Sequence, residues 1–415
     1  MKVGTGFAFP DFYQPLLQSL AQQAHAQGSG HLALVGGAVR DALLHHQCRE
    51  PRRAPVDLDL VLEGSCEDLV SRLQETLGPR RVTNVVVHQQ FGTAELQIDG
   101  VPIDLAAARI ETYPAPGQNP LVQAGALDED LARRDFTVNA MALVLDPDGS
   151  QLLMDPHGGQ VDLALRHLAF LHDGSVADDP TRVVRAARYC ARLGFCLAPE
   201  ALSQVAFTLS AWPWSWHLGD PVDAVPPALG TRLRMELDLL LEREPWAEAV
   251  VLLQAWSAMP LLDPWLQSEA RLIRRLGWAS RLGLPAMAAL VASASDPIAL
   301  AQRLQIPLQQ QRWLAELLEL RSWLLMEVFS HSWAEWDVLQ WTRSIEAGRW
   351  SVEAVALAVL DNPPCWRPLL RWWGRWRHVA SPVSARELMA EGLRPGPELG
   401  EALRQGREQV LAGMR

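Results

Sequence analysis

The hydrophobic periodicity of this chain changes once, near its first third, and the change limits the folds open to it. In the first 145 residues, short apolar stretches alternate with polar residues at 56–62, 81–88 and 94–106. A period of two predicts half-buried strands, and the last stretch turns over at Asp99-Gly100 as a hairpin would. Beyond Gly158-Gly159, apolar residues recur every three or four positions, which predicts helices over 178–210, 230–257, 268–283 and 297–328.

We therefore expect an α+β chain, with a mixed α/β head followed by an all-α remainder. A chain of 415 residues is too long for one ordinary core, so two to four compact units are expected. Proline-containing breaks separate the helical stretches and suggest where the units meet. The predicted segments are 1–145, 146–235, 236–330 and 331–415.

Composition narrows the class of protein. Hydrophobic residues make up 49% of the chain and charged residues 20%, as in soluble globular proteins. Charged residues or prolines interrupt every apolar run before the roughly 20 residues that a membrane span needs. The stretch from Met1 to Pro10 lacks the pattern of a signal peptide, and the five cysteines show no C-x-x-C spacing. We expect a cytoplasmic protein with no membrane partner.

The net charge of −11 by itself argues against nucleic-acid binding. This argument is weak, because a local stripe of arginine can hold a phosphate backbone while the rest of the surface stays acidic. Of the 17 tryptophans, most lie in the helical half. Aromatic rings can stack on unpaired bases, but tryptophans at helical spacing, such as Trp333, Trp336 and Trp341, are more often core residues.

Two features of the head indicate chemistry on phosphates. Gly36-Gly37 separates a predicted strand at 31–35 from a predicted helix at 38–46, which lets backbone N–H groups at the helix start approach a triphosphate. Asp57 and Asp59 are two residues apart on a strand and so share a face. Two such carboxylates can hold a pair of divalent cations. Exposed aspartates at a strand edge are common, so this pair alone is weak support.

Whole segments of the chain match one family in order and spacing. Val-Gly-Gly-Ala-Val-Arg-Asp at 35–41, Asp-Leu-Asp at 57–59 and Arg-Arg-Asp-Phe-Thr-Val-Asn-Ala-Met-Ala at 133–142 resemble the head motifs of class II tRNA nucleotidyltransferases. These are the CCA-adding enzymes, and bacterial poly(A) polymerases share their head. Further matches lie at 155–163, 178–188 and 232–237. The resemblance returns at 384–404, which looks like the tail with which the family holds tRNA.

The resemblance implies both an architecture and a reaction. The architecture is a palm-like head at 1–145, a neck with a nucleobase-recognition helix at 146–235, a helical body at 236–330 and a tRNA-binding tail at 331–415. The reaction is the template-independent addition of C and A from CTP and ATP to the 3′ end of tRNA, with two Mg²⁺ ions. Addition of CC or A alone and poly(A) synthesis are close alternatives. A non-catalytic RNA-binding protein and a small-molecule nucleotidyltransferase are disfavoured, the first by the intact aspartate pair and the second by the tail motif.

The implied site residues fall into three groups. Asp57 and Asp59 are catalytic and hold metal, and Asp104 on the strand after the Asp99-Gly100 turn is a third candidate ligand. Arg394 and Gly396 in the tail would contact RNA, at a turn before a helix start. The nucleotide-binding group comprises Gly36, Gly37, Arg40, Arg134, Asp135, Asn139, Asp178, Asp179, Arg182, Arg185 and Arg188.

The stretch at 178–188 resembles the motif with which the family reads the base. Asp179 and Arg182 are one helical turn apart, so a carboxylate acceptor beside a guanidinium donor can imitate the edge of a partner base. The family usually has Glu where this chain has Asp178, which is one methylene shorter, so its support of Arg182 is the weakest part of the match. As an alternative, Asp178 caps a helix that begins with Pro180.

Four other segments have a structural and a functional interpretation. Asp155 and Gly158-Gly159 resemble the family's hinge between head and neck, or form a plain turn. Arg232 and Glu236 have the spacing of a helix-stabilising pair. Residues 113–127 are rich in turn residues, and we interpret them as a mobile loop. The run 366–378 interleaves arginine and tryptophan, and it either contacts tRNA or forms an amphipathic helix with a tryptophan core face.

Overall fold

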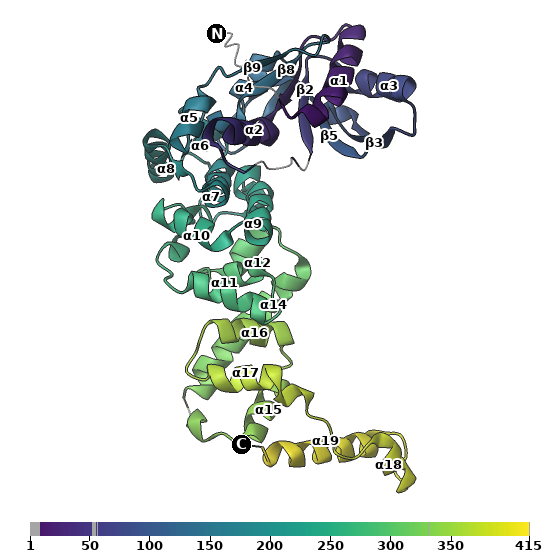
Figure 1. The fold of residues 1–415 in the computed structure, drawn as a ribbon. Helices are drawn as coiled ribbons and strands as arrows, with labels where there is room; N and C mark the ends of the chain where they lie inside the picture. Colours follow the sequence, from purple (N-terminus) through teal and green to yellow (C-terminus); the bar gives the residue numbers. More distant parts are fainter. Residues whose placement is uncertain (1–8, 52–54, 56, 331, 415) are drawn as a thin grey trace. The chain divides into compact units, whose positions relative to one another are not determined.

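The computed structural model describes residues 9–51, 55, 57–330 and 332–414 and divides them into two compact units. The first unit comprises the chain up to residue 217 together with 226–236 and 244–258. The second comprises 218–225, 237–243 and everything from 259 onward. Figure 1 shows the strands gathered in the N-terminal part and helices in the remainder, which confirms the predicted fold class. The finer division into four segments remains a prediction.

A seven-stranded sheet forms the centre of the first unit, in the order β3-β4-β5-β2-β1-β8-β9. The pair β2–β5 is parallel, and the other neighbours are antiparallel. Two small sheets lie outside it, an antiparallel β6–β7 hairpin and a parallel β10–β11 pair. The strands are β1 (Leu32–Val35), β2 (Leu58–Leu62), β3 (Val82–His88), β4 (Thr93–Ile98), β5 (Val101–Ala107), β6 (Arg109–Thr112), β7 (Leu121–Ala124), β8 (Ala142–Leu145), β9 (Gln151–Met154), β10 (His167–Leu168) and β11 (Cys196–Leu197).

The predicted strands follow from alternation and turn chemistry. Asp99 and Gly100 have φ values of 51° and 81°, the left-handed conformations that a two-residue hairpin turn between β4 and β5 requires. In β5 the buried Ile103 and Leu105 alternate with the exposed Asp104. On one face of the sheet, Ala33, Val35 and Val61 pack with residues of α4 and β8 in a buried cluster. Asp59 shares that face with Val61, because residues two apart on a strand point the same way.

Helices surround the sheet and continue into the neck of the first unit. Helices α2 and α3 contact its strands, and α10 packs along α7 (Figure 1). Helix α9 begins in the first unit and ends in the second. The helices are α1 (Gln14–Ala26), α2 (Gly36–Cys48), α3 (Cys66–Leu77), α4 (Leu127–Ala132), α5 (Gly159–Leu165), α6 (Ser175–Asp178), α7 (Thr181–Leu193), α8 (Pro199–Ala211), α9 (Thr231–Arg243) and α10 (Trp246–Ala255).

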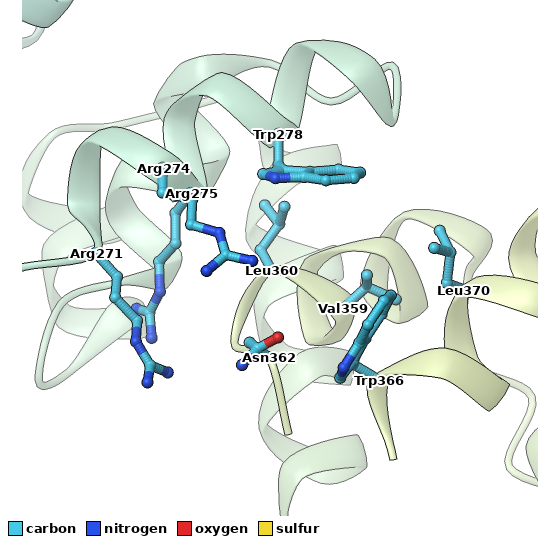
Figure 2. Close-up of a pocket in the computed structure, with 9 residues that line it drawn as sticks. All are labelled: Arg271, Arg274, Arg275, Trp278, Val359, Leu360, Asn362, Trp366 and Leu370. Carbon is cyan, nitrogen blue, oxygen red and sulfur yellow. The ribbon is translucent and has the colours of Figure 1, made fainter. Parts of the chain in front are cut away.

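The second unit is built of helices packed in pairs. Helix α14 lies against α16, and α16 against α17 and α11. A cleft lined by residues of α11, α16 and α17 opens within this unit (Figure 2). Its helices are α11 (Leu272–Arg281), α12 (Ala286–Ala292), α13 (Pro297–Arg303), α14 (Leu308–Trp323), α15 (Val338–Ala347), α16 (Val352–Leu360), α17 (Trp366–Gly374), α18 (Ala385–Ala390) and α19 (Pro397–Ala412).

The tryptophans at helical spacing are packing residues, as predicted. The ring centres of Trp336 and Trp333 lie 5.0 Å and 6.2 Å from that of Trp341, which is 2% exposed. The run at 366–378 forms α17 and a following turn, with Trp372 and Trp376 buried. This arrangement confirms the amphipathic interpretation. None of the helices in the described residues combines the length and apolar character that crossing a membrane requires.

The segment 113–127 has more regular structure than we predicted. Leu121–Ala124 forms β7, which pairs with β6, and α4 begins at Leu127. The connection between the two strands is held by backbone hydrogen bonds, from Gly117 N–H to the Asp178 carbonyl and from Ala228 N–H to the Gly117 carbonyl. Sequence missed β7 because all four of its residues are exposed and carry no hydrophobic alternation.

Gly159 is expected to be sensitive to a single added methyl group. A Cβ there would overlap the carbonyl oxygen of Thr137 and lie 2.9 Å from Met141 Cγ, whereas a Cβ on Gly374 would meet nothing within 4 Å. Overpacking of this kind costs roughly 1–3 kcal/mol. We expect Gly159→Ala to lower the melting temperature, measured by differential scanning fluorimetry, and Gly374→Ala to leave it unchanged. Equal melting temperatures for the two variants would contradict the close contact.

Candidate active site

Three aspartates gather on two adjacent strands. Asp57 directly precedes β2, Asp59 lies in β2, and the parallel register places Asp59 opposite Asp104 of β5. Burial, followed by the charges of Asp57 and Asp104, raises the pKa of the Asp59 carboxyl to about 6, against the opposing effect of Arg134. Burial, Asp57 and Glu95 likewise raise the pKa of Asp104. Within the described residues, no three His, Cys, Asp or Glu side chains are already arranged as metal ligands.

The start of α2 lies beside this carboxylate group. Helix α2 begins at Gly36, two residues before the predicted start, so the Gly-Gly pair forms its first turn, and no side chain caps it. Gly36 has a φ of 68°, and a Cβ there would lie 3.2 Å from Asp59 Oδ2 and 3.8 Å from Arg134 Nη1. A side chain would therefore fill the space between a helix N-terminus, a carboxylate and a guanidinium. Uncapped N–H groups at such a position can bind an anion such as a phosphate.

Arg134 is held at this position by Asp130, a residue that the sequence analysis did not single out. The buried Asp130 carboxylate accepts hydrogen bonds from Arg134 Nη2 at 2.8 Å and from Arg133 Nη2 at 2.7 Å. The Nε of Arg134 is buried and has no partner in the structure. The spacings of three and four residues along α4 and the turn after it are the only signal that pointed to Asp130.

Arg40, Asn139 and Asp135 form a hydrogen-bonded chain behind the site. Arg40 Nη1 donates to Asn139 Oδ1 at 2.8 Å, and Asn139 Nδ2 donates to Asp135 Oδ1 at 3.1 Å. Arg40 is only 3% exposed and also bonds Asp41. The structure thus brings these three predicted residues together, with Arg40 buried as a support for the other two.

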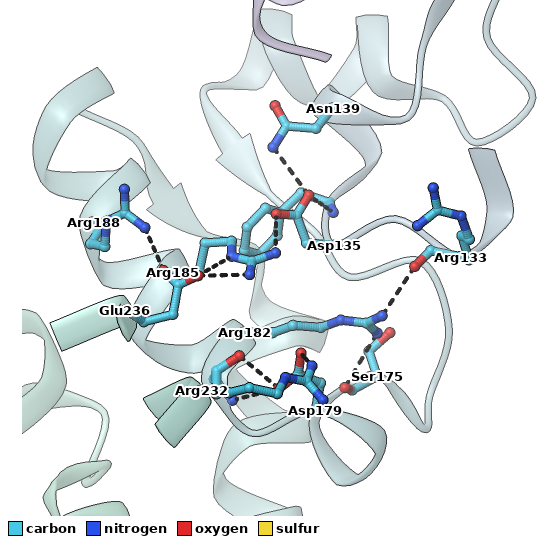
Figure 3. A network of polar contacts seen from close by, with 12 residues as sticks. Arg133, Asp135, Asn139, Ser175, Asp179, Arg182, Arg185, Arg188, Arg232 and Glu236 are labelled. Atoms are coloured by element: carbon cyan, nitrogen blue, oxygen red, sulfur yellow. Dashed lines mark hydrogen bonds and ion pairs between the residues drawn. The ribbon is translucent and has the colours of Figure 1, made fainter. Parts of the chain in front are cut away.

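Arg185 and Arg188 continue the chain to α9 through Glu236. Arg185 donates to Asp135 Oδ2 at 3.3 Å and to Glu236 Oε1 through Nε at 3.0 Å and Nη2 at 2.7 Å (Figure 3). Arg188 pairs with the other oxygen of Glu236 and with Glu244 at 3.1 Å. The predicted pair between Arg232 and Glu236 is therefore wrong. Arg232 pairs instead with Asp179, which precedes α7. Glu236 pairs instead with Arg185 and Arg188 of α7.

The predicted base-reading residues lie together at the junction of α6 and α7. Asp179 accepts hydrogen bonds from the backbone and hydroxyl of Thr181, at 3.1 Å and 2.6 Å, and pairs with Arg232. Arg182 donates to the carbonyls of Ser175 at 3.3 Å and Arg133 at 3.1 Å (Figure 3). Asp179, and not Asp178, caps the helix.

Asp178 ends α6 and does not bond Arg182 in the structure. Its carboxylate lies 3.9 Å from His172 Nε2, and burial raises its pKa against the opposing effects of His172 and Arg182. Arg182 is held by backbone carbonyls instead.

Tyr113 is a second residue of the site that the sequence analysis missed. It follows β6, and burial raises the pKa of its hydroxyl. The charges that also act on this hydroxyl are those of Arg182, Asp179, Glu111 and Arg232, in that order. The hydroxyl lies 3.5 Å from Glu111 Oε2. No sequence pattern pointed to Tyr113, because the turn-rich segment that it begins has no hydrophobic periodicity.

The segment that resembles the family's hinge forms a hydrogen-bonded turn before α5. Asp155 accepts hydrogen bonds from the N–H groups of Gly159 at 2.7 Å and Gln160 at 3.0 Å, at the start of α5. Asp162 accepts a hydrogen bond of 2.5 Å from Thr137 Oγ1. These contacts fit a capped helix start packed against the segment that carries Asn139.

The tail residues lie in the second unit. Arg394 is exposed. Gly396 has a φ of 158° and directly precedes α19. Helix α19 begins with Pro397, so the first N–H groups that its N-terminus offers belong to Glu398 and Leu399.

Comparison with known proteins extends this description beyond the geometry. Residues 32–169 match the model of the poly(A) polymerase head domain. The chain is 35% identical to the CC-adding tRNA nucleotidyltransferase of Deinococcus radiodurans, over 92% of this chain and 84% of that protein. It is 41% identical to the A-adding tRNA nucleotidyltransferase of Aquifex aeolicus, but over only 40% of this chain and 19% of that one.

A solved structure shows the same fold over nearly the full length. The Thermotoga maritima CCA-adding enzyme complexed with tRNA superimposes with a TM-score of 0.69 at 21% identity, covering 99% of this chain and 93% of that one. The head with its sheet and the helical remainder are thus a known architecture.

Glu236 should anchor the arginines of α7. Glu236→Gln leaves Arg185 and Arg188 without their shared carboxylate, and loss of one partner from a buried ion pair costs about 3–5 kcal/mol. Because the amide still accepts a hydrogen bond, we expect a loss near the lower end, seen as a lower melting temperature. Glu242→Gln, on the exposed side of α9, is the control. If both variants melt alike, Glu236 is not an anchor.

Proposed function

The chain belongs to the tRNA nucleotidyltransferase family, and we propose that it adds C and A residues from CTP and ATP to the 3′ end of tRNA without a nucleic-acid template. The observation that carries this proposal is the position of Asp59, which lies opposite Asp104 and beside the uncapped start of α2. A carboxylate group next to an anion-binding helix start suits the transfer of a nucleotide from a triphosphate.

The aspartates suit two Mg²⁺ ions, which we propose as cofactors. Carboxylate oxygens are the ligands that Mg²⁺ prefers, and the charges of Asp57 and Asp104 raise the pKa of Asp59 against the opposing charge of Arg134. Asp57 and Asp59 would hold the ions, with Asp104 as a third carboxylate. Such ions supply activation of the primer hydroxyl and neutralisation of the leaving pyrophosphate.

The residues around the metal ligands would orient the triphosphate. We assign the phosphates to the N–H groups at Gly36 and Gly37 and to Arg134, whose buried Nε has no partner among the described residues. The Asp135 carboxylate, fixed by Asn139 and Arg185, is the proposed acceptor for the ribose 2′-OH. A deoxynucleotide would leave that acceptor unpaired and would be selected against.

Base selection is assigned to Asp179 and Arg182. Thr181 and Arg232 fix the carboxylate, and two backbone carbonyls fix the guanidinium. Side chains held in this way could pair with a base edge without a template, because their donors and acceptors stay in place when the base leaves. We further assign the phosphate backbone of tRNA to the tail turn at Arg394 and Gly396.

A narrower reaction, the addition of CC alone, is the second candidate. The relative that matches 92% of this chain is a CC-adding enzyme, whereas the A-adding match covers 40%. The products of a single assay separate these possibilities.

The reaction is tested with three tRNA transcripts that end before CCA, after C and after CC. Each is incubated with Mg²⁺ and with CTP, ATP or both, and the products are sized at single-nucleotide resolution. Growth of the first transcript by three nucleotides would establish full CCA addition, and arrest after two would establish CC addition. No extension of any transcript would refute the proposed function.

The same assay tests the carboxylates. Asp59→Asn should abolish extension, with a loss of activity on the order of a thousandfold or more, because a metal ligand is removed. Glu95→Gln is the matched control, since Glu95 lies across from Asp104 on its other side and is exposed. This control should keep near-normal activity.

Asp179 should govern the choice of base. Asp179→Asn replaces one acceptor oxygen by a donor, so we expect the preference for CTP over UTP in kcat/KM to fall at least tenfold. Arg232→Ala removes the ion pair but leaves the carboxylate, and it should retain most of the preference. An equal loss in both variants would show that the ion pair, and not the carboxylate, sets the preference.

A further inference from the structure

The cleft of the second unit combines arginines and tryptophans from two helices. Arg271, Arg274 and Trp278 come from α11 or the residue before it, and Trp366 from the start of α17. Figure 2 shows the arginines on one side of the cleft and the two indole rings on the other. The cleft is shallow, with a volume of about 60 Å³, and it is partly open to solvent.

Two of these arginines have no partner to explain their position. Among the described residues, the side chains of Arg271 and Arg274 make no ion pair or hydrogen bond, and both are exposed. Arg275, beside them, is held loosely by Glu269 at 3.6 Å and Asp361 at 3.9 Å. Its Nε is buried without an acceptor. The wall thus offers positive charge and unused donors.

The acidic groups near this wall are already engaged. Asp361 accepts two hydrogen bonds from Arg321, at 2.7 Å and 2.8 Å. Glu269 accepts a hydrogen bond of 2.9 Å from the backbone N–H of Arg271 and lies 3.6 Å from Arg275. No acidic side chain is among the described residues that line the cleft. The side chains of Arg271 and Arg274 are therefore left to meet an entering anion.

The indole rings supply a flat apolar surface with a cation behind it. The guanidinium of Arg281 lies 5.0 Å from the ring centre of Trp278, and that of Arg367 lies 5.4 Å from the ring centre of Trp366. Both rings are partly exposed. Stacking on arginine limits the motion of each ring and adds positive charge at the rim. The side chain of Asn362, also in the lining, can both donate and accept hydrogen bonds.

We propose that this cleft binds a nucleoside phosphate, with the phosphate against Arg271 and Arg274 and the base stacked on an indole ring. The ligand needs an anionic group next to a planar aromatic ring, and a nucleotide has both. It is either an unpaired nucleotide of a bound RNA or a free nucleotide. The site lies entirely in the second unit and is separate from the residues of the proposed reaction.

The charge requirement is tested by binding without triphosphate, so that the result does not depend on nucleotide transfer. We would measure filter binding of a tRNA transcript lacking CCA at several salt concentrations. Arg271→Ala/Arg274→Ala should weaken binding about tenfold and lower the salt slope by about 1 to 2. Arg312→Ala, an exposed arginine of α14 outside the cleft, should match the wild type. Melting temperatures confirm that each variant is folded.

Stacking of the base is tested by substituting Trp366. Trp366→Leu keeps an apolar side chain but removes the ring, and loss of one base stack should weaken binding about tenfold. Trp366→Phe should restore most of the affinity. If the arginine variant weakens binding and Trp366→Leu does not, the cleft is only a charged patch and the proposal is wrong.

Calorimetry with AMP and CMP, without RNA, distinguishes the two sources of the ligand. Free-nucleotide binding that the arginine and Trp366→Leu variants lose, with tRNA affinity unchanged, would identify a free nucleotide as the ligand. Loss of tRNA affinity, without measurable AMP or CMP binding, would identify an RNA nucleotide. If neither tRNA nor free nucleotides bind these variants differently from Arg312→Ala, the proposal is overturned.

Discussion

The parallel pairing of β2 with β5 places Asp59 directly opposite Asp104, and much of the first unit can be understood from the resulting concentration of negative charge. Like charges that are partly buried beside one another disfavour ionisation, which is why the pKa of Asp59 is raised. Neighbouring carboxylates of this kind persist in a fold where a cation balances their charge, or where the strands hold them together despite their repulsion. Here a central sheet with a buried apolar cluster on the same face supplies the fixed frame. Arg134 offers only partial compensation, and the absence of a side chain at Gly36 leaves room for a charged ligand.

A second constraint is the chain of ion pairs that links the sheet to the helices after it. Asn139 and Asp135 follow α4, Arg185 belongs to α7, and Glu236 to α9. The bonds of Arg185 to Asp135 and to Glu236 join residues 50 and 51 positions apart, so they tie α7 both to the segment after α4 and to α9. Arg185 and Arg188, which the resemblance implies as nucleotide ligands, also bond carboxylates of the protein, and Arg185 holds Asp135 in position.

The elements that could be predicted from sequence are those specified by local chemistry. The helix that follows the Gly-Gly pair and the turn at Asp99-Gly100 depend on neighbouring residues alone, and both are present, although α2 begins at Gly36, two residues earlier than predicted. The parallel register of Asp59 with Asp104 could not be predicted, because 44 residues of chain separate them and nothing in either strand specifies its partner. The pairing of Arg232 was mispredicted for a related reason: a helical spacing of four is only one candidate contact, and Asp179 from another segment competes successfully.

The second unit shows how an acidic protein can still present a surface for nucleic acid. Net charge averages over ion pairs such as Arg321 with Asp361 and Arg407 with Glu346, which cancel locally and contribute little to the field outside. What an approaching phosphate meets is the charge left over, and around the cleft of α11 and α17 that remainder is positive because Arg271 and Arg274 have no acidic neighbour in its lining. The tryptophans have a similar division of roles. Trp341 and Trp372 are buried and hold the helices together, while Trp278 and Trp366 keep part of their rings exposed beside those arginines. A residue type that is mostly structural here can therefore form a recognition surface where packing leaves one face of the ring open.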